Sequence, residues 1–293
     1  MTTGVLLMTY GAPRDDAELP AYLARVRGGR EPDGALVEEM RRRYARIGGS
    51  PLVAITEAQA AALEAALGPE FRVRAGMRYS APAIGDRVRE LGDVERIVGL
   101  VMSPQWSALL MRGYADALAS STDRPTVTVG AWHREPAFVA ALAARLRAAR
   151  DDLPGAPVLL TAHSLPRRVF DAEPGYVAQL QETGALVAAA AGLDPGEWEW
   201  AYQSAGHTQE EWLRPDLKER FPALAAAGHR DVLVAPVQFL ADHLEVLYDL
   251  DVAAAAEAEA AGLRYHRVAM PNCDPAFIAA LAAIVRRAEP VPV

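Results

Sequence analysis

Short apolar runs alternate with helical patterns along the whole chain. The apolar runs cover residues 5–9, 72–77, 97–102 and 126–131, and then residues 158–162, 198–202, 232–236 and 264–269. Helical periodicity separates them, for example at residues 55–67, 108–119, 137–150, 176–191 and 276–288. Strands that are apolar throughout and alternate with helices are typical of parallel sheets covered on both faces. The pattern predicts an α/β fold with two Rossmann-like, doubly wound units, each with a four-stranded parallel sheet.

The two halves of the chain are similar to each other. VLLMTYGAP at residues 5–13 aligns without a gap with VLLTAHSLP at residues 158–166, and EPAFVAAL at 135–142 returns as DPAFIAAL at 274–281. Tyr10 and His163 therefore occupy equivalent places. We expect an internal duplication, with an N-terminal domain at residues 1–150 and a C-terminal domain at residues 151–293. The last helix is expected to pack back on the first domain.

The first half carries an insertion after its first strand, at about residues 14–55. It is rich in arginine, with Arg25, Arg27, Arg30, Arg41, Arg42, Arg43 and Arg46. A solvated helix face explains such a cluster, and so does a rim that binds anions, because guanidinium groups suit carboxylates. The position favours the rim, since ligand crevices of α/β proteins form at the carboxyl ends of the strands.

Composition narrows the class of protein. The net charge of −8 argues against a nucleic-acid partner. The single cysteine, Cys273, excludes an internal disulfide and any cysteine-built zinc or iron–sulfur site. We find no secretory signal pattern and no apolar run near the ~20 residues that cross a bilayer. A cytoplasmic protein without a transmembrane segment is expected.

Polar side chains follow several of the expected strands. By the rule that such residues line the ligand crevice, Tyr10, Gln105, His133, His163 and Gln203 should face it. A lone histidine after a strand is also common as a hydrogen-bonded loop residue. Farther along, Asp242, Glu245 and Asp249 fall at helical spacing on one face. That face is either solvated or, if it is buried beside His163, a source of proton acceptors and metal ligands.

Several motifs in the same order resemble the ferrochelatase family. They are LMTYGAP at residues 7–13, YARIGGSPL at 44–52, WHREP at 132–136, TAHSLP at 161–166, YQSAG at 202–206, DHLEVLYD at 242–249 and MPN at 270–272. The resemblance implies two domains with a porphyrin cleft between them, and the insertion of ferrous iron into a porphyrin during heme biosynthesis. It implies that His163 and Glu245 form the catalytic pair at the metal-insertion site. Asp249 is interpreted as a proton relay toward solvent.

The resemblance also indicates which porphyrin is used. Tyr10 matches a tyrosine of the coproporphyrin III branch that ligates the product iron from the opposite face and that protoporphyrin IX enzymes typically lack. Four residues match positions that this branch uses to contact the propionates: Arg27, Arg43, Tyr44 and Ser50. A fifth predicted substrate residue, His133, stands where the family commonly has a tyrosine. The expected substrates are therefore coproporphyrin III and ferrous iron, and the product is coproheme. No permanently bound cofactor and no iron–sulfur cluster are expected.

The chain departs from the family pattern at three places. The segment around Ser50 is one residue short, Gln105 replaces a histidine, and Gln238 stands where a glycine is usual. Three alternatives stay open: a protoporphyrin IX ferrochelatase, a chelatase for cobalt or nickel, and a non-catalytic tetrapyrrole carrier on the same scaffold. A carrier has no need of His163 and Glu245. We expect a monomer, with the next enzyme of heme synthesis as a further partner.

Overall fold

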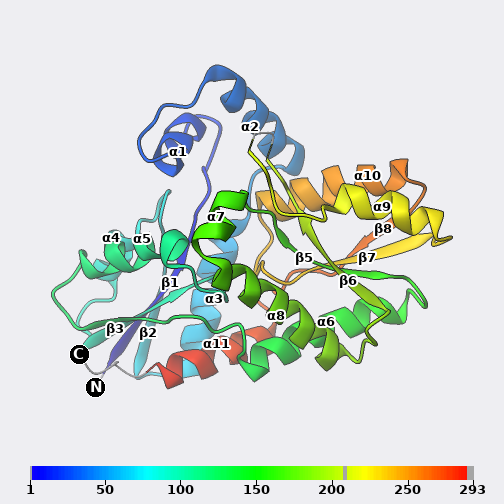
Figure 1. Cartoon of the computed structure of the whole chain (residues 1–293). Helices are drawn as coiled ribbons and strands as arrows, with labels where there is room; N and C mark the ends of the chain where they lie inside the picture. The colour runs from blue at the N-terminus through cyan, green and yellow to red at the C-terminus, as the bar shows by residue number, and fades with distance from the viewer. Residues whose placement is uncertain (1, 207–209, 289–293) are drawn as a thin grey trace.

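The fold contains two parallel sheets, one in each half of the chain (Figure 1). The computed structural model describes residues 2–206 and 210–288. The first sheet has the order β2-β1-β3-β4 and is built from β1 (Thr3–Thr9), β2 (Phe71–Met77), β3 (Arg96–Val101) and β4 (Thr126–Thr128). The second has the order β6-β5-β7-β8, from β5 (Val158–His163), β6 (Trp198–Gln203), β7 (Asp231–Pro236) and β8 (Arg264–Arg267). The equivalent strand orders confirm the predicted doubly wound α/β fold.

Helices connect the parallel strands, as such crossovers require. In the first half these are α1 (Leu19–Val26), α2 (Gly34–Ile47), α3 (Leu52–Leu67), α4 (Ile84–Glu90), α5 (Ala108–Ala119) and α6 (Pro136–Asp151). In the second half they are α7 (Arg167–Ala172), α8 (Pro174–Ala191), α9 (Leu217–Ala226), the π-helix η1 (Glu245–Ala254), α10 (Ala255–Ala260) and α11 (Pro275–Arg287). None of the helices in the described ranges is long and apolar enough to cross a membrane.

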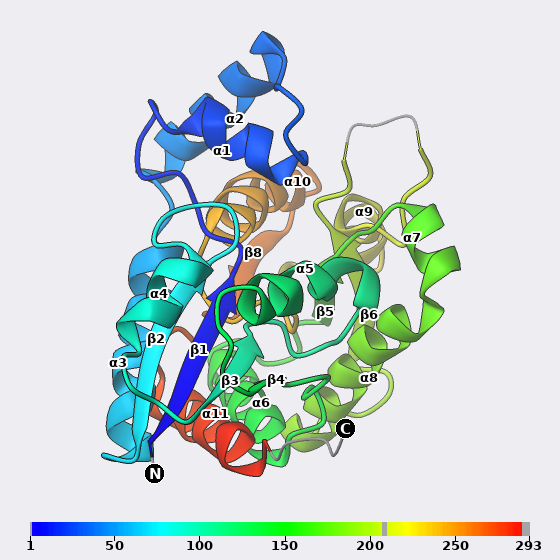
Figure 2. The ribbon, with the colours of Figure 1, turned by 90° about the vertical axis from the view of Figure 1, so that its left-hand side faces the viewer.

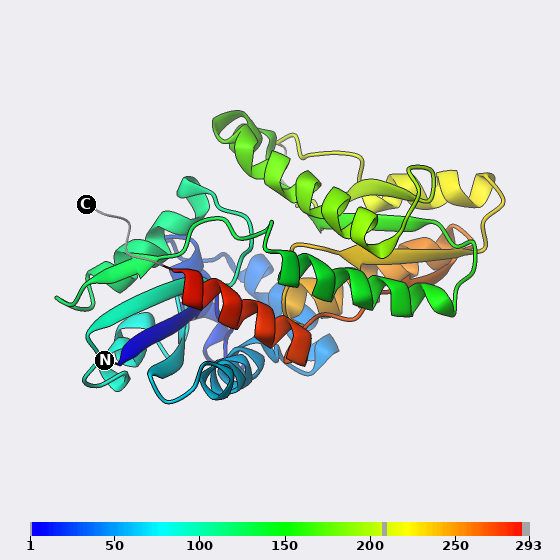
Figure 3. The same ribbon diagram turned by 90° about the horizontal axis from the view of Figure 1, so that it is seen from below.

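The last helix, α11, joins the two halves. Figure 3 shows it running beside α6 and α3. Phe277 of α11 and Phe138 of α6 are fully buried with their ring centroids 6.3 Å apart, and burying each ring stabilises the fold by roughly 1.5–3 kcal/mol. Arg286 donates a hydrogen bond to the carbonyl of Ala66 at the end of α3. Helix α6 in turn packs against α8 of the second half, and the domain division at residue 150 stays a prediction.

The arginine-rich insertion forms α1 and α2, which lie beyond the carboxyl end of the first sheet (Figure 2). Asp33 caps α2 by accepting a hydrogen bond from the Leu36 amide at 2.8 Å. Gly48 ends the helix in the left-handed region with φ 73°, which glycine adopts without steric cost. Tyr22 and Leu23 of α1 are buried against Tyr44 of α2 and its neighbours, so the two helices pack together as one unit.

Helix η1 is a π-helix that begins at Glu245. Such helices are rare and are found frequently at functional sites. Leu250 and Ala254 are buried against the second sheet, which fixes the inner face of η1. Glu245 in the first turn thereby lies beside His163, the last residue of β5.

Candidate active site

A cavity of about 610 Å³ lies at the carboxyl ends of both sheets. This is the size range of ligand pockets in proteins. The first half contributes Thr9, Tyr10, Tyr22, Tyr44, Ser50, Arg78, Tyr79, Ser103 and Tyr114 to its lining, and the second half contributes His163, Tyr176, Gln238, Phe239, His243 and Glu245. Apolar side chains from α1, α2 and α5 complete the walls. The cavity therefore has aromatic walls and a few polar groups that converge from both sheets.

His163 is the last residue of β5, and its Nε2 faces Glu245. Its Nδ1 lies 2.5 Å from the carbonyl oxygen of Ser164. Because a carbonyl oxygen only accepts, Nδ1 carries the proton of the neutral ring and donates it there. The lone pair is then on Nε2, which lies 3.9 Å from Glu245 Oε2. His163 therefore presents a nitrogen that can accept a proton or bind a metal ion.

Glu245 lies between two histidines. His243 Nδ1 donates to the Ala241 carbonyl at 2.9 Å, and His243 Nε2 lies 3.6 Å from Glu245 Oε2, so Nε2 bears a proton toward the carboxylate when the ring is charged. Burial opposes ionisation of Glu245, but His163 and His243 outweigh it and lower the pKa of Glu245 to about 2. Burial likewise opposes the charged form of His243, and the Glu245 carboxylate nevertheless raises the pKa of His243. The carboxylate thus stays ionised at neutral pH.

Sequence reasoning did not single out His243 as a site residue. The signal was present, since His243 stands inside the DHLE motif two positions before Glu245. Its orientation depends on a loop that no local pattern reveals. Throughout residues 2–206 and 210–288, no three His, Cys, Asp or Glu side chains form a cluster that could hold a metal ion on its own.

Tyr10 enters the cavity from the other half. It follows β1 directly, is 42% exposed and packs edge-on against Tyr79 with the ring centroids 4.6 Å apart. Partial burial, followed by the nearby Tyr79 and Glu245, raises the pKa of Tyr10 above its ordinary range. The hydroxyl is therefore neutral at neutral pH. The structure places Tyr10 and the His163–Glu245 pair in one cavity, each at the carboxyl end of its own sheet.

Arg43 and Asp249 bind each other across the two halves. Arg43 Nη1 lies 3.4 Å from Asp249 Oδ1, and Arg43 Nε donates to Glu39 at 2.8 Å. The guanidinium also lies over the ring of Tyr248, 5.0 Å from its centroid. Burial and the Glu245 charge raise the pKa of Asp249. Helix α2 is thus tied to η1 through Arg43, and the contact of Arg43 with a propionate stays a prediction.

The other predicted substrate residues lie at different depths. Tyr44 and Ser50 line the cavity. Burial raises the pKa of Tyr44 to about 12, and Ser50 Oγ accepts a hydrogen bond from the Leu52 amide at 3.4 Å. Arg27 is exposed at the end of α1, directly after Val26 of the cavity wall. Arg27 is therefore available to an anion that projects from the cavity.

The prediction that His133, Gln105 and Gln203 face the ligand is wrong. His133 is 5% exposed and its Nε2 lies 2.9 Å from Glu182 Oε2 on α8. Gln105 donates to Thr183 on the same helix at 2.8 Å, and Gln203 accepts from Thr161 at 2.6 Å. Helix α8 covers the segments that carry His133 and Gln105, so their side chains turn into the interface between the halves instead of the cavity.

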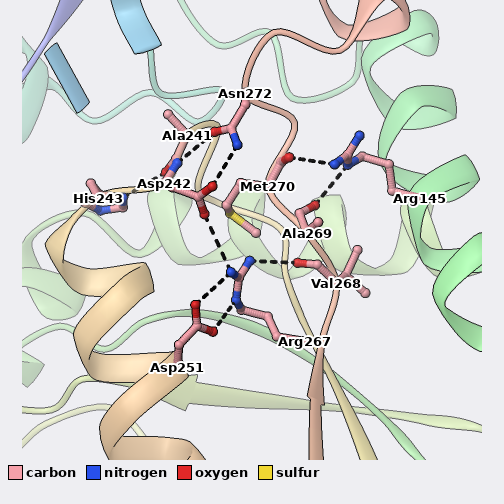
Figure 4. A network of polar contacts seen from close by, with 10 residues as sticks. All are labelled: Arg145, Ala241, Asp242, His243, Asp251, Arg267, Val268, Ala269, Met270 and Asn272. Atoms are coloured by element: carbon pink, nitrogen blue, oxygen red, sulfur yellow. Dashed lines mark hydrogen bonds and ion pairs between the residues drawn. The ribbon is translucent and has the colours of Figure 1, made fainter. Parts of the chain in front are cut away.

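Asp242 is not among the cavity-lining residues and precedes η1, so the expected helical face of three carboxylates is not formed. Its side chain binds Asn272 and Arg267 instead (Figure 4). Asn272 Nδ2 donates to Asp242 Oδ2 at 2.7 Å, and the Asp242 amide donates back to Asn272 Oδ1 at 2.9 Å. Arg267 Nη2 lies 3.6 Å from Asp242 and also binds Asp251 of η1. This network holds the loop before η1, and with it the backbone of His243.

The sequence matches a known protein family and individual relatives over nearly its whole length. The model of the family described as Ferrochelatase matches residues 2–289. A ferrochelatase of Deinococcus radiodurans is 38% identical over 300 residues, covering 97% of this chain and 95% of the relative. A coproporphyrin III ferrochelatase of Geobacillus kaustophilus is 38% identical over 302 residues, with coverage of 97% and 95%.

Two solved structures share the fold. CbiX, described as the terminal enzyme of siroheme biosynthesis in denitrifying bacteria, matches with a TM-score of 0.59 and 16% identity over 99% of this chain and 100% of that one. SirB from Bacillus subtilis with Fe³⁺ matches with a TM-score of 0.56 and 13% identity, over 98% and 96%. The sequence matches are extensive, and the chain belongs to the ferrochelatase family.

Proposed function

We propose that this member of the ferrochelatase family inserts ferrous iron into coproporphyrin III and gives coproheme. The family makes the chain a metal chelatase, a lyase of heme biosynthesis. One observation carries the proposal furthest: Tyr10 from the first sheet and His163 with Glu245 from the second line the same cavity. Relatives at 35–38% identity named coproporphyrin III ferrochelatases support the choice of porphyrin. Iron is a substrate here, and the proposal includes no resident cofactor.

Metal insertion removes two pyrrole protons while the ion loses its bound waters. His163 Nε2 is the acceptor for the first proton, because Nδ1 is already engaged with the Ser164 carbonyl. An imidazole is suited to this role, since its ordinary pKa of about 6.5 lies near neutral pH. Until it takes up that proton, the same lone pair is free to act instead as the first nitrogen ligand of the arriving ion, so the two roles are alternatives.

Glu245 stabilises the charge that develops on His163. Its carboxylate is ionised and lies 3.9 Å from His163 Nε2, a separation that a small ring movement closes. The charged form of His243 attracts the same oxygen, which lies 3.6 Å from its Nε2. Asp249 follows one turn of η1 later, and its raised pKa suits a group that passes a proton onward to solvent.

Substrate selectivity tests the choice of porphyrin. Coproporphyrin III carries four carboxylates where protoporphyrin IX has two, and hydrogen bonds to charged groups contribute about 1.5–3 kcal/mol each. We expect kcat/KM for iron insertion to be at least about tenfold higher with coproporphyrin III, which corresponds to one such hydrogen bond. Steady-state rates on both porphyrins under the same conditions measure this. Equal efficiency on the two substrates contradicts the proposal for coproporphyrin III.

Arg27 is the rim residue to change. Its guanidinium is exposed beside the cavity wall, so Arg27→Ala should weaken coproporphyrin III binding about tenfold, or about 1.5 kcal/mol, the lower end for a charge-assisted hydrogen bond. Arg42→Ala is the matched control, because Arg42 is 67% exposed and pairs with Glu39 of its own helix. Titration of porphyrin fluorescence gives both affinities. A similar loss in the two variants shows a general charge effect and removes the role of Arg27.

Tyr10 and His163 should give different signatures when they are changed. Tyr10→Phe removes a hydroxyl that can ligate product iron, so the visible spectrum and retention of bound coproheme should change more than the insertion step. His163→Ala should slow insertion and leave the Tyr10 ligation of added coproheme intact. Absorption spectra of the product complexes and single-turnover rates separate the two. A Tyr10→Phe product spectrum identical to that of the parent protein contradicts the two-sided cavity.

A further inference from the structure

The side chain of Gln238 binds the backbone of His163. Gln238 follows β7, and its Oε1 accepts a hydrogen bond from the His163 amide at 2.8 Å. The amide nitrogen of the same side chain donates to the Tyr176 hydroxyl at 3.0 Å. Both Gln238 and Tyr176 line the cavity. Gln238 is also one of the positions where the chain departs from the glycine usual in its family.

The strand geometry explains why His163 needs this partner. In a parallel sheet the amides of alternate residues point to the same neighbouring strand. The Thr161 carbonyl accepts from Val237 on the β7 side, and the Ser164 amide donates to Gln203 on the β6 side, so the His163 amide points toward β7. Pairing between β5 and β7 ends at Thr161 and Pro236, however. Beyond the end of β7, the Gln238 side chain accepts the hydrogen bond that a backbone carbonyl of the neighbouring strand would otherwise accept.

Gln238 begins a series of polar contacts that crosses into the first half. Tyr176 of α8 is 3% exposed, and its hydroxyl accepts from Gln238 and is hydrogen-bonded with the Ser103 side chain. Ser103 follows β3, and its hydroxyl donates to the Gln105 carbonyl at 3.2 Å. The end of β5 is thereby connected to the loop after β3.

We propose that Gln238 is a positioning residue that holds His163 in line with the porphyrin, with Tyr176 as the brace that fixes the Gln238 amide. The proposal rests on the proposed function, since His163 must act on the substrate for its alignment to matter. Gln238 touches the backbone of His163 and leaves the Nε2 face open. It should therefore affect turnover more than substrate binding.

The central variant is Gln238→Met, which keeps the length of the side chain and removes both hydrogen bonds. We expect kcat to fall by between about tenfold and 100-fold, because small misplacement of a reacting group costs this much. KM for coproporphyrin III should stay within about twofold, since the aromatic walls and Arg27 are unchanged. Gln238→Glu keeps an acceptor at the same reach and should recover most of the lost kcat. An unchanged kcat in Gln238→Met overturns the proposal, and so does a Gln238→Glu variant no better than Met.

Tyr176→Phe tests the brace through a double-mutant cycle. The single change should lower kcat less than Gln238→Met does, and the double variant should be no slower than Gln238→Met alone, because both act through one chain. Effects that multiply show that Tyr176 does not act through Gln238 and overturn that part of the proposal.

Gln179→Met is the matched control. The Gln179 amide also bridges the halves, accepting from the Trp106 amide at 2.9 Å and donating to its carbonyl at 3.1 Å, and it lies outside the cavity lining. This variant should lower thermal stability without changing kcat; an equal fall in kcat would assign the effect to loosening of the interface. If the unchanged protein inserts no iron, the proposed function fails. If the unchanged protein inserts iron and Gln238→Met has the same kcat, only the positioning role fails.

Discussion

His163→Ala should lower the turnover of iron insertion by at least about 100-fold, the usual scale for the loss of a general base. The side chain provides the Nε2 lone pair in the cavity, and its Nδ1 is held by the Ser164 carbonyl. Alanine can neither accept the pyrrole proton nor bind the ion. Porphyrin binding should persist, since the aromatic walls and the rim arginines remain. Steady-state rates with coproporphyrin III, together with a fluorescence titration of binding, measure both quantities.

His266→Ala is the control for this change. His266 also pairs with a carboxylate, Asp231, at 2.9 Å, but it lies on β8 outside the cavity lining. Its removal should leave turnover near that of the parent protein. If a folded His163→Ala protein keeps near-normal turnover, His163 is not the proton acceptor and the assignment is wrong.

Glu245→Gln should have the second large effect, a fall in turnover of about 100-fold. The change keeps the shape of the side chain and removes the charge that faces both His163 and His243. Preorganised charge at the reacting centre is worth about 10²–10³ in turnover in other enzymes. Because the pKa of Glu245 is held at about 2, the carboxylate is ionised across the neutral range and its loss should lower turnover at every pH from 6 to 9.

The chain offers a matched control in Glu182. This residue forms a second histidine–carboxylate pair with His133, at 2.9 Å, in the interface outside the cavity. Glu182→Gln should lower stability and leave turnover per folded molecule unchanged. Turnover corrected for the folded fraction by circular dichroism compares the two variants. An equal fall in both contradicts a specific role for the Glu245 charge.

Much of the architecture was predictable from local pattern. Continuous apolar runs separated by helical periodicity are enough to indicate two parallel sheets, because strands buried on both faces leave no polar positions. The repeat around Tyr10 and His163 indicated that the two residues end equivalent strands. Their position followed from chain direction alone, since the carboxyl ends of parallel strands meet at one edge. The family motifs added Glu245, which no periodicity could identify as different from an exposed acid.

The directions of the remaining side chains depend on how the folded elements pack together. His133 and Gln105 follow strands just as His163 does, yet α8 packs over their segments and turns them into an interface. Arg43 lies on the insertion as expected, and the approach of η1 engages it with Asp249. His243 reaches Glu245 because its loop is held by Asn272 and Arg267, residues distant in sequence. The hydrophobic pattern was sufficient to define the period and order of the elements. Side-chain direction depended on neighbours brought together by folding, which a local pattern does not contain.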